Sequence, residues 1–157
     1  MPKHLYGSDH DFLPRSQLLS YEEIATTASV FAALGVKKLR LTGGEPLIRR
    51  DLEKLVAMLS VIPGIDDLSL TTNASRLTAE KAMALRDAGL SRITISLDAL
   101  DDPTFMAIND VDFPVRKVLE GVANAEAAGL PVKVNMVVKR GGNEHSIVPM
   151  ARFFHGS

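Results

Sequence analysis

The sequence predicts an α/β fold: about four parallel strands arranged as in a βα barrel, with helices on the outside. Two observations carry this prediction. Four times along the 157 residues, a helical segment ends at a glycine and is followed by an apolar residue and a short strand-like run. Strands that alternate with amphipathic helices form parallel βα units. In addition, all four strands place polar residues at alternate positions, which favours the inside of a barrel that holds a polar ligand.

The four glycines mark the ends of predicted helices. A glycine just past a helix adopts the left-handed conformation that closes the last turn without a steric penalty. The glycines are Gly35, Gly64, Gly89 and Gly129. The strands that follow them are expected at 37–42, 67–72, 92–97 and 131–138.

The helices have start signals of their own. Ser20 and Glu23 have the spacing of a capping box, and Thr78 is placed to cap the following helix. Asp102 before Pro103 is typical of an N-cap followed by proline in the first turn. We expect helices at roughly 21–34, 51–60, 79–88, 103–108, 115–128 and 144–154.

The alternation within the strands separates two parallel architectures. In a doubly wound sheet both faces lie under helices, so its strands read as nearly continuous apolar runs. Here each strand has a polar side instead, formed by Arg40 and Thr42, by Ser69, Thr71 and Asn73, by Thr94, Ser96 and Asp98, and by Lys133 and Asn135. The competing interpretation is that these are strand-end residues near solvent, and for Thr94 alone it would be preferred. The four strands together favour a lined interior.

Composition excludes several function classes. The chain is 46% hydrophobic and 24% charged with a net charge of −1, so no broad positive field exists to hold a nucleic acid or an anionic membrane surface. No apolar run approaches the roughly 20 residues of a membrane span. The first residues lack the apolar stretch of a secretion signal, and we expect a cytoplasmic protein. Because the chain has no cysteine, disulfides, thiolate zinc sites and iron–sulfur clusters held by its own thiolates are excluded.

The most informative segment is the end of the first predicted strand, Thr-Gly-Gly-Glu-Pro at 42–46. Gly43 and Gly44 would let a ligand approach the main chain closely, and Glu45 could accept hydrogen bonds from a ligand ammonium group. Ligands of parallel βα folds bind at the carboxyl ends of the strands, where this segment falls. A tight turn with a solvated glutamate is an equally good interpretation of the spacing alone.

The wider motif set resembles a known family. LRLTGGEPLIR (39–49) is similar to the segment after the second strand of radical S-adenosylmethionine enzymes. Four further segments follow the order and spacing of the GTP 3′,8-cyclase family of molybdenum cofactor biosynthesis. They are FLPRSQLLSYEEI (12–24), LTTN (70–73), ITISLDALD (93–101) and KVLEGVANAEAAGLPVKVNMVVKRGGNE (117–144). That family converts GTP to (8S)-3′,8-cyclo-7,8-dihydroguanosine 5′-triphosphate by radical chemistry.

The resemblance implies ligand roles for seven residues. Those implied for S-adenosylmethionine are Gly43, Gly44, Glu45 and Ser96, and those implied for GTP are Arg40, Thr71 and Lys133. The pattern of the strands agrees, because it puts two cations on inward faces, where buried cations need partners and a triphosphate is a natural one. A salt bridge from Lys133 to a barrel carboxylate such as Asp98 is the alternative.

The main departures of this sequence from the family concern the cysteines that hold its iron–sulfur clusters. The family carries a [4Fe–4S] cluster on a C-x3-C-x2-C loop that continues into Met-Pro, whereas this chain starts at Met1-Pro2 and ends at RFFHGS (152–157). We therefore expect residues 1–157 to be a single partial core domain, without the first βα unit, the C-terminal part and either cluster, and inactive alone. The four histidines lack ligand spacing and are expected at the surface; they are His4, His10, His145 and His155.

Smaller departures and alternatives remain. Ala74 stands where glycine usually follows TTN, and Ile108-Asn109-Asp110 stands where a Gly-Arg pair is common. Unpaired strand edges at both ends of a partial barrel would lead either to a homo-oligomer that pairs them or to poor stability in solution. The alternatives to a cyclase part are another radical S-adenosylmethionine enzyme, such as a peptide-modifying one, or a non-catalytic binding or structural remnant.

Overall fold

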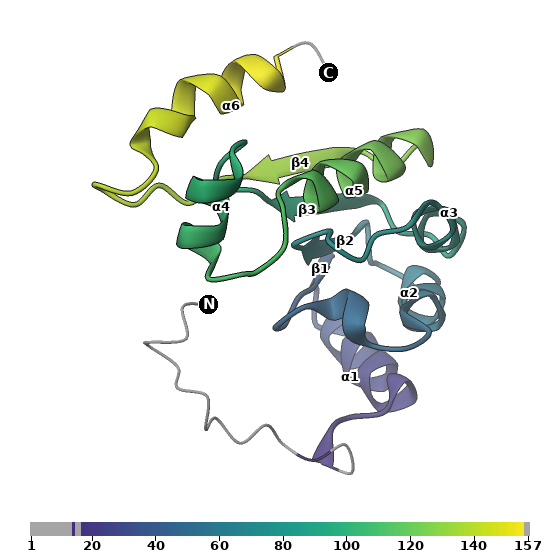
Figure 1. Ribbon diagram of the computed structural model, residues 1–157. Helices are drawn as coiled ribbons and strands as arrows, with labels where there is room; N and C mark the ends of the chain where they lie inside the picture. Colours follow the sequence, from purple (N-terminus) through teal and green to yellow (C-terminus); the bar gives the residue numbers. More distant parts are fainter. Residues whose placement is uncertain (1–13, 15–16, 156–157) are drawn as a thin grey trace.

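The protein is built on one parallel four-stranded sheet (Figure 1). A computed structural model describes residues 14 and 17–155. The strands are β1 (Lys38–Leu41), β2 (Asp67–Thr72), β3 (Arg92–Ser96) and β4 (Val132–Asn135). They pair in the order β1-β2-β3-β4, and each neighbouring pair is parallel. A doubly wound sheet reverses its strand order at a switch point, whereas a barrel adds strands consecutively. The predicted α/β class with four parallel strands is confirmed.

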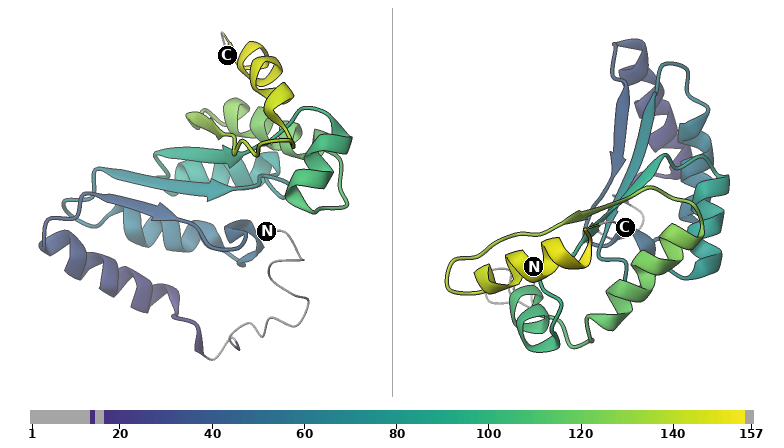
Figure 2. Two further views of the ribbon diagram at one scale, coloured as in Figure 1. Left: turned by 90° about the vertical axis from the view of Figure 1, so that its left-hand side faces the viewer. Right: turned by 90° about the horizontal axis from the view of Figure 1, so that it is seen from above.

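Most helices lie on one side of this sheet. Figure 2 shows α1 (Tyr21–Ala33), α2 (Leu52–Ser60), α3 (Ala79–Asp87) and α5 (Arg116–Ala127) on the same face. The remaining elements are α4 (Asp102–Asn109), α6 (Ile147–Phe153) and the short 3-10 turns η2 (Pro46–Ile48) and η3 (Glu144–Ser146). No helix in the part of the chain that the structure describes is long and apolar enough to cross a membrane.

The core fills the space between the sheet and these helices. The sheet contributes Leu68, Leu70, Ile93 and Ile95, all fully buried. They share one face because they alternate along neighbouring strands that are in register. The helices contribute Leu55, Val56, Leu59, Leu85, Val118 and Val122. Full burial of each aliphatic side chain is worth about 1.5–3 kcal/mol, so this layer fixes the polar side chains to the opposite face.

The opposite face of the sheet is polar. Arg40 pairs in register with Ser69, and Thr71 pairs with Thr94, which in turn pairs with Lys133. Residues in register on parallel strands point to the same side. The polar side predicted for each strand is therefore a single continuous face, turned away from the four helices. Thr94, for which a solvent-exposed end was the preferred interpretation, is buried.

The predicted helix boundaries follow their capping residues. Ser20 and Glu23 form the full capping box of α1, with both reciprocal hydrogen bonds, and Thr78 Oγ1 accepts from Lys81 N at the start of α3. The four helix-ending glycines all have positive φ, between 76° and 99°. The sequence signals at these positions describe local backbone chemistry, which the tertiary fold leaves unchanged.

Two predicted boundaries are wrong. The cap of α4 is Asp101, not Asp102, because Asp101 Oδ1 accepts from Thr104 N at 2.9 Å. Asp102 instead accepts from Val115 N at the start of α5. The last strand ends at Asn135 rather than at residue 138, since Val137 N donates to the side chain of Asp98 and leaves the strand ladder.

A close contact joins α5 to the turn after β2. Ala74 has a φ of 56°, in the left-handed region that favours glycine, and it is buried. Gly121 of α5 lies directly against it: a Cβ at Gly121 would be 2.5 Å from the carbonyl oxygen of Ala74 and 2.9 Å from its Cβ. Helix α5 can approach the sheet this closely only because residue 121 has no side chain.

Replacing Gly121 by alanine is expected to destabilise the protein by about 1–3 kcal/mol through overpacking against Ala74. Intrinsic helix propensity would change the stability in the opposite direction, because alanine is more favourable than glycine in a helix interior by about 1 kcal/mol. The sign of the change in the free energy of unfolding, measured by urea denaturation, therefore decides between the two effects. A stabilised Gly121→Ala variant would show that the contact does not constrain the helix.

Candidate functional site

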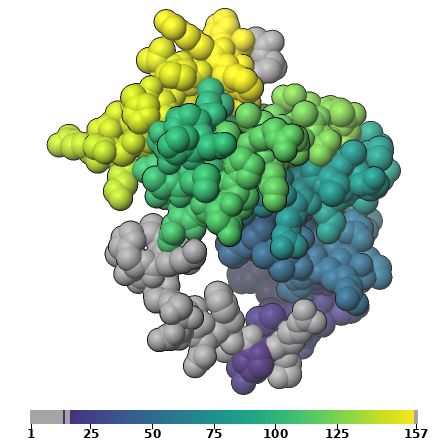
Figure 3. Space-filling view, in the orientation of Figure 1, coloured from purple at the N-terminus to yellow at the C-terminus, as the bar shows by residue number. Residues whose placement is uncertain are grey.

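A cavity of about 290 Å³ opens at the carboxyl ends of the strands. The ends of β1, β2 and β3 bound it, together with the segment from α4 toward α5. The surfaces of these parts of the chain lie next to one another in Figure 3. The lining residues are Thr42, Gly43, Gly44, Glu45, Thr71, Thr72, Asn73, Ser96, Phe105, Asn109, Val111 and Phe113. Loops at this end of parallel strands are where βα folds hold their ligands.

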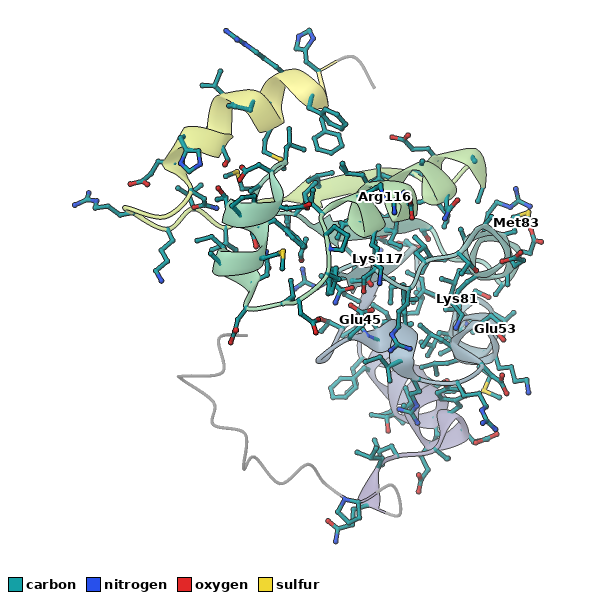
Figure 4. The ribbon with its side chains drawn as sticks, viewed as in Figure 1. Glu45, Glu53, Lys81, Met83, Arg116 and Lys117 are labelled. Atoms are coloured by element: carbon teal, nitrogen blue, oxygen red, sulfur yellow. The ribbon has the colours of Figure 1, made fainter. Side chains whose placement is uncertain are left out.

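Glu45, labelled in Figure 4, is the most strongly fixed polar side chain of this cavity. Its Oε1 accepts from Leu47 N at 3.0 Å and from the hydroxyl of Thr72 at 2.6 Å, while its Oε2 accepts from Asn73 N at 2.8 Å. These bonds tie the turn after β1 to the end of β2. The alternative of a freely solvated glutamate is wrong, because both oxygens have protein donors and the side chain is half-buried.

Gly43 and Gly44 border the cavity on open space. A Cβ added at either residue would meet no described atom within 4 Å, and the φ of Gly44 lies outside the left-handed region. Neither packing nor backbone conformation therefore explains a glycine at position 44. A ligand that approaches the main chain closely would explain it, because a side chain would occupy the ligand's place.

The hydroxyl of Thr71 also points to a ligand. Among the side chains that the structure describes, Thr71 Oγ1 is the buried polar atom without a hydrogen-bond partner. A buried hydroxyl without a partner costs roughly 1–3 kcal/mol, and native proteins contain few such groups. Since Thr71 lines the cavity, a bound molecule with a polar group would remove this cost.

An aromatic wall faces these polar groups. The rings of Phe105 and Phe113 are tilted by 60° with centroids 5.7 Å apart, and Val111 lies beside them in the lining. Asn109 Nδ2 donates to Phe105 O. Asp110 follows with a φ of 52°, in the left-handed region that favours glycine. The sequence pattern did not indicate this wall as a functional element, although the departure from the family at 108–110 lies within the segment.

The structure gathers five of the seven predicted ligand residues in this cavity and leaves two outside. Those that line it are Gly43, Gly44, Glu45, Ser96 and Thr71. Arg40 lies on β1, two residues before the cavity-lining Thr42, and borders a separate apolar groove next to α1. Lys133 lies on β4, two strands from Thr71, which corresponds to about 10 Å at the usual strand spacing.

The expectation that Arg40 and Lys133 are buried cations is wrong. Both side chains are exposed, because β1 and β4 are the outer strands of the four that the structure describes. The alternative of a salt bridge between Lys133 and Asp98 does not hold within the described residues either. Asp98 Oδ1 accepts from Val137 N at 2.7 Å instead, and the salt bridges of the described ranges do not include either cation.

The residues present do not fit a metal centre. The described part of the chain contains no group of three or more histidine, cysteine, aspartate or glutamate side chains that could hold an ion. His145 and His155 are exposed, as expected, and His4 and His10 lie outside the described residues. A [4Fe–4S] cluster requires thiolates, which this sequence does not contain.

Comparison with known proteins places this geometry in a family. The sequence profile of the Radical SAM superfamily matches residues 6–154. The chain belongs to the radical SAM superfamily. Full-length radical SAM proteins use S-adenosylmethionine and a [4Fe–4S] cluster, and the cavity with its open glycines and unpartnered Thr71 fits the first of these two groups.

Relatives and solved structures agree with this assignment. A GTP 3′,8-cyclase of Staphylococcus aureus (strain bovine RF122 / ET3-1) is 49% identical over 154 residues, which cover 98% of this chain and 45% of the relative; that of strain JH9 gives the same values. The chain thus spans less than half the length of these radical SAM relatives. In fold it resembles HydG, a maturase of the [FeFe]-hydrogenase (TM-score 0.73, 14% identity, 94% of this chain and 35% of that one). It also resembles methylornithine synthase, PylB (TM-score 0.69, 16% identity, 85% and 41%).

At the amino end of its polar face, this radical SAM chain carries an ion pair. Arg92 Nε donates to Asp67 Oδ1 at 3.1 Å and Arg92 Nη2 donates to Oδ2 at 2.8 Å. Hydrogen bonding and charge from Arg92 lower the pKa of Asp67 below its ordinary value of 3.8. The pair joins β2 to β3 on the side of the sheet opposite the core.

This pair predicts a specific acid sensitivity. Because the folded-state pKa of Asp67 is lowered, its stabilisation is complete above pH 3.8 and is lost as the pH falls through the lowered pKa. Asp67→Asn is therefore expected to be less stable than the wild type at neutral pH, with a difference that narrows in acid. Urea denaturation at several pH values measures this, and a constant difference between the two proteins would contradict it.

Proposed function

We propose that this chain is the central part of a GTP 3′,8-cyclase of molybdenum cofactor biosynthesis and that its cavity binds S-adenosylmethionine. The observation that carries the proposal is the meeting of Gly43, Gly44, Glu45 and Thr71 around one opening at the strand ends. The name of the relatives supports the choice of reaction among those of the superfamily. We further propose that residues 1–157 form one incomplete core domain.

The methionine end of S-adenosylmethionine would lie against the first strand turn. Glu45 is a fixed carboxylate and would accept a hydrogen bond from the ligand ammonium. Gly43 and Gly44 leave room for the methionine carboxylate beside the main chain, and Ser96 would contact the cofactor from the end of β3. When bound and reductively cleaved, S-adenosylmethionine supplies the carbon radical that starts the chemistry of the superfamily.

GTP would lie over the polar face of the sheet, next to the cofactor. Arg40 and Lys133 project from the two outer strands, and exposed cations without carboxylate partners in the described ranges are suited to a triphosphate. Thr71 lies between them and also lines the cofactor cavity, so it would mark the boundary between the two ligands. This position explains why a residue expected to contact GTP is grouped with cofactor residues.

The proposed reaction requires an iron–sulfur cluster, which these residues cannot hold. With no cysteine, this chain would bind its ligands but would not turn them over alone. The parts that hold the cluster would be supplied by a longer protein, since the chain covers 45% of the relatives. Both proposed ligands are cytoplasmic metabolites, and the proposal therefore implies a cytoplasmic location.

The reaction can be tested in a longer protein that joins this chain to a C-x3-C-x2-C loop and the C-terminal part of the family. Loaded with clusters and supplied anaerobically with reductant, S-adenosylmethionine and GTP, it is expected to form the 3′,8-cyclised nucleotide. Lys133→Ala is expected to weaken GTP binding about tenfold, the loss of one charged contact. Formation of no cyclised product, or an unchanged GTP affinity in Lys133→Ala, would favour another radical SAM reaction.

The cofactor cavity can be tested with Gly44→Ala. A methyl group there meets no described atom within 4 Å, so the free energy of unfolding is expected to stay the same or rise slightly. The affinity for S-adenosylmethionine, measured by calorimetry, is expected to fall at least tenfold because the methyl group takes the ligand's place. Ala123→Gly on the exposed side of α5 is the control: it should lower stability and leave binding unchanged. Equal binding by Gly44→Ala and wild type would argue against a ligand at this turn.

A further inference from the structure

We propose that Thr72 is a positioning residue: its hydroxyl orients the Glu45 carboxylate so that one oxygen, Oε2, remains available for the ammonium group of S-adenosylmethionine. The inference rests on the proposed cofactor site and adds a residue to which sequence reasoning gave no role. Thr72 ends β2, directly after Thr71, and its side chain is on the opposite side of the strand from that of Thr71.

The direction of the Thr72 hydrogen bond is fixed by its second partner. Ala74 N donates to Thr72 Oγ1 at 3.0 Å, so the hydroxyl oxygen serves as an acceptor there. Its single hydrogen is then directed to Glu45 Oε1, at an oxygen–oxygen distance of 2.6 Å. A bond this short is typical of a hydroxyl that donates to an ionised carboxylate. Thr72 is also 3% exposed, so water does not compete for this hydrogen.

The two carboxylate oxygens of Glu45 are unequally occupied. Oε1 has two donors, Leu47 N and the Thr72 hydroxyl, which match its two lone pairs. Oε2 has one protein donor, Asn73 N. One acceptor position therefore remains on Oε2, in a side chain that lines the cavity. An ammonium group carries three hydrogens and has no acceptor, which makes it the natural partner of this position.

Without the hydroxyl of Thr72, the carboxylate would be held less firmly. Oε1 would keep only the bond from Leu47 N, within its own turn, and the link between the turn and β2 would depend on Asn73 N alone. Rotation of the carboxylate would then point Oε2 away from the ligand in part of the population. The effect should be limited to the ligand's amino group, because the bond from Asn73 N would still hold the turn that carries Gly43 and Gly44.

The test is calorimetric titration of the 157-residue chain with S-adenosylmethionine and with its analogue that lacks the α-amino group. Thr72→Val keeps the shape of the side chain and removes the hydroxyl, and it is expected to lower the affinity for S-adenosylmethionine about tenfold. Its affinity for the deaminated analogue is expected to equal that of the wild type. Thr72→Ser, which restores the hydroxyl, should recover most of the lost affinity. Thr26→Val removes a threonine hydroxyl from α1, outside the cavity, and should bind as the wild type does.

The outcomes separate this inference from the proposed function. A wild-type chain that does not bind S-adenosylmethionine would contradict the proposed cofactor site, and the inference with it. A wild-type chain that binds, with Thr72→Val binding equally well or losing both ligands in the same proportion, would overturn the positioning role alone. If Thr72→Val does not fold, Thr72→Ala and Thr72→Ser, which differ by the hydroxyl, make the same comparison.

Discussion

The carboxylate of Glu45 joins the turn after β1 to the end of β2. It receives a main-chain donor from its own turn and two donors from the end of β2, one from a side chain and one from the main chain. Fixing the turn in this way also fixes the two glycines before it, which border the cavity on open space. The candidate site therefore depends on one charged group that is itself held in place by neutral donors.

The general architecture could be predicted because short sequence patterns specify the ends of its helices and the two faces of its sheet. Gly35, Gly64, Gly89 and Gly129 mark helix ends through backbone conformation alone, and each has the positive φ expected of it. The period-two alternation of polar and apolar residues in the strands indicates a sheet covered on one face, and the consecutive strand order agrees with it. These signals lie within a few residues of the structure that they specify.

The site was predictable only in part, because its contacts join distant segments. The hydrogen bond between Thr72 and Glu45 joins residues 27 positions apart in the sequence. The aromatic wall formed by Phe105 and Phe113 is likewise distant in sequence from the strand ends beside which the fold places it. The exposure of Arg40 and Lys133 depends on which strands are outermost, a property of the whole sheet. Even the cap of α4 was misassigned, since Asp101 and Asp102 are equivalent as sequence signals and differ only in what each can reach.

The contact between Gly121 and Ala74 connects the outer helical layer with this site. The amide of Ala74 donates to Thr72, so the backbone against which α5 rests is the same backbone that sets the hydroxyl beside Glu45. Positions 74 and 121 are therefore not free to diverge separately over evolutionary time. A larger residue at 121 would require the turn at 74 to withdraw, and divergent members of the family should show paired replacements at these two positions, 47 residues apart in the chain.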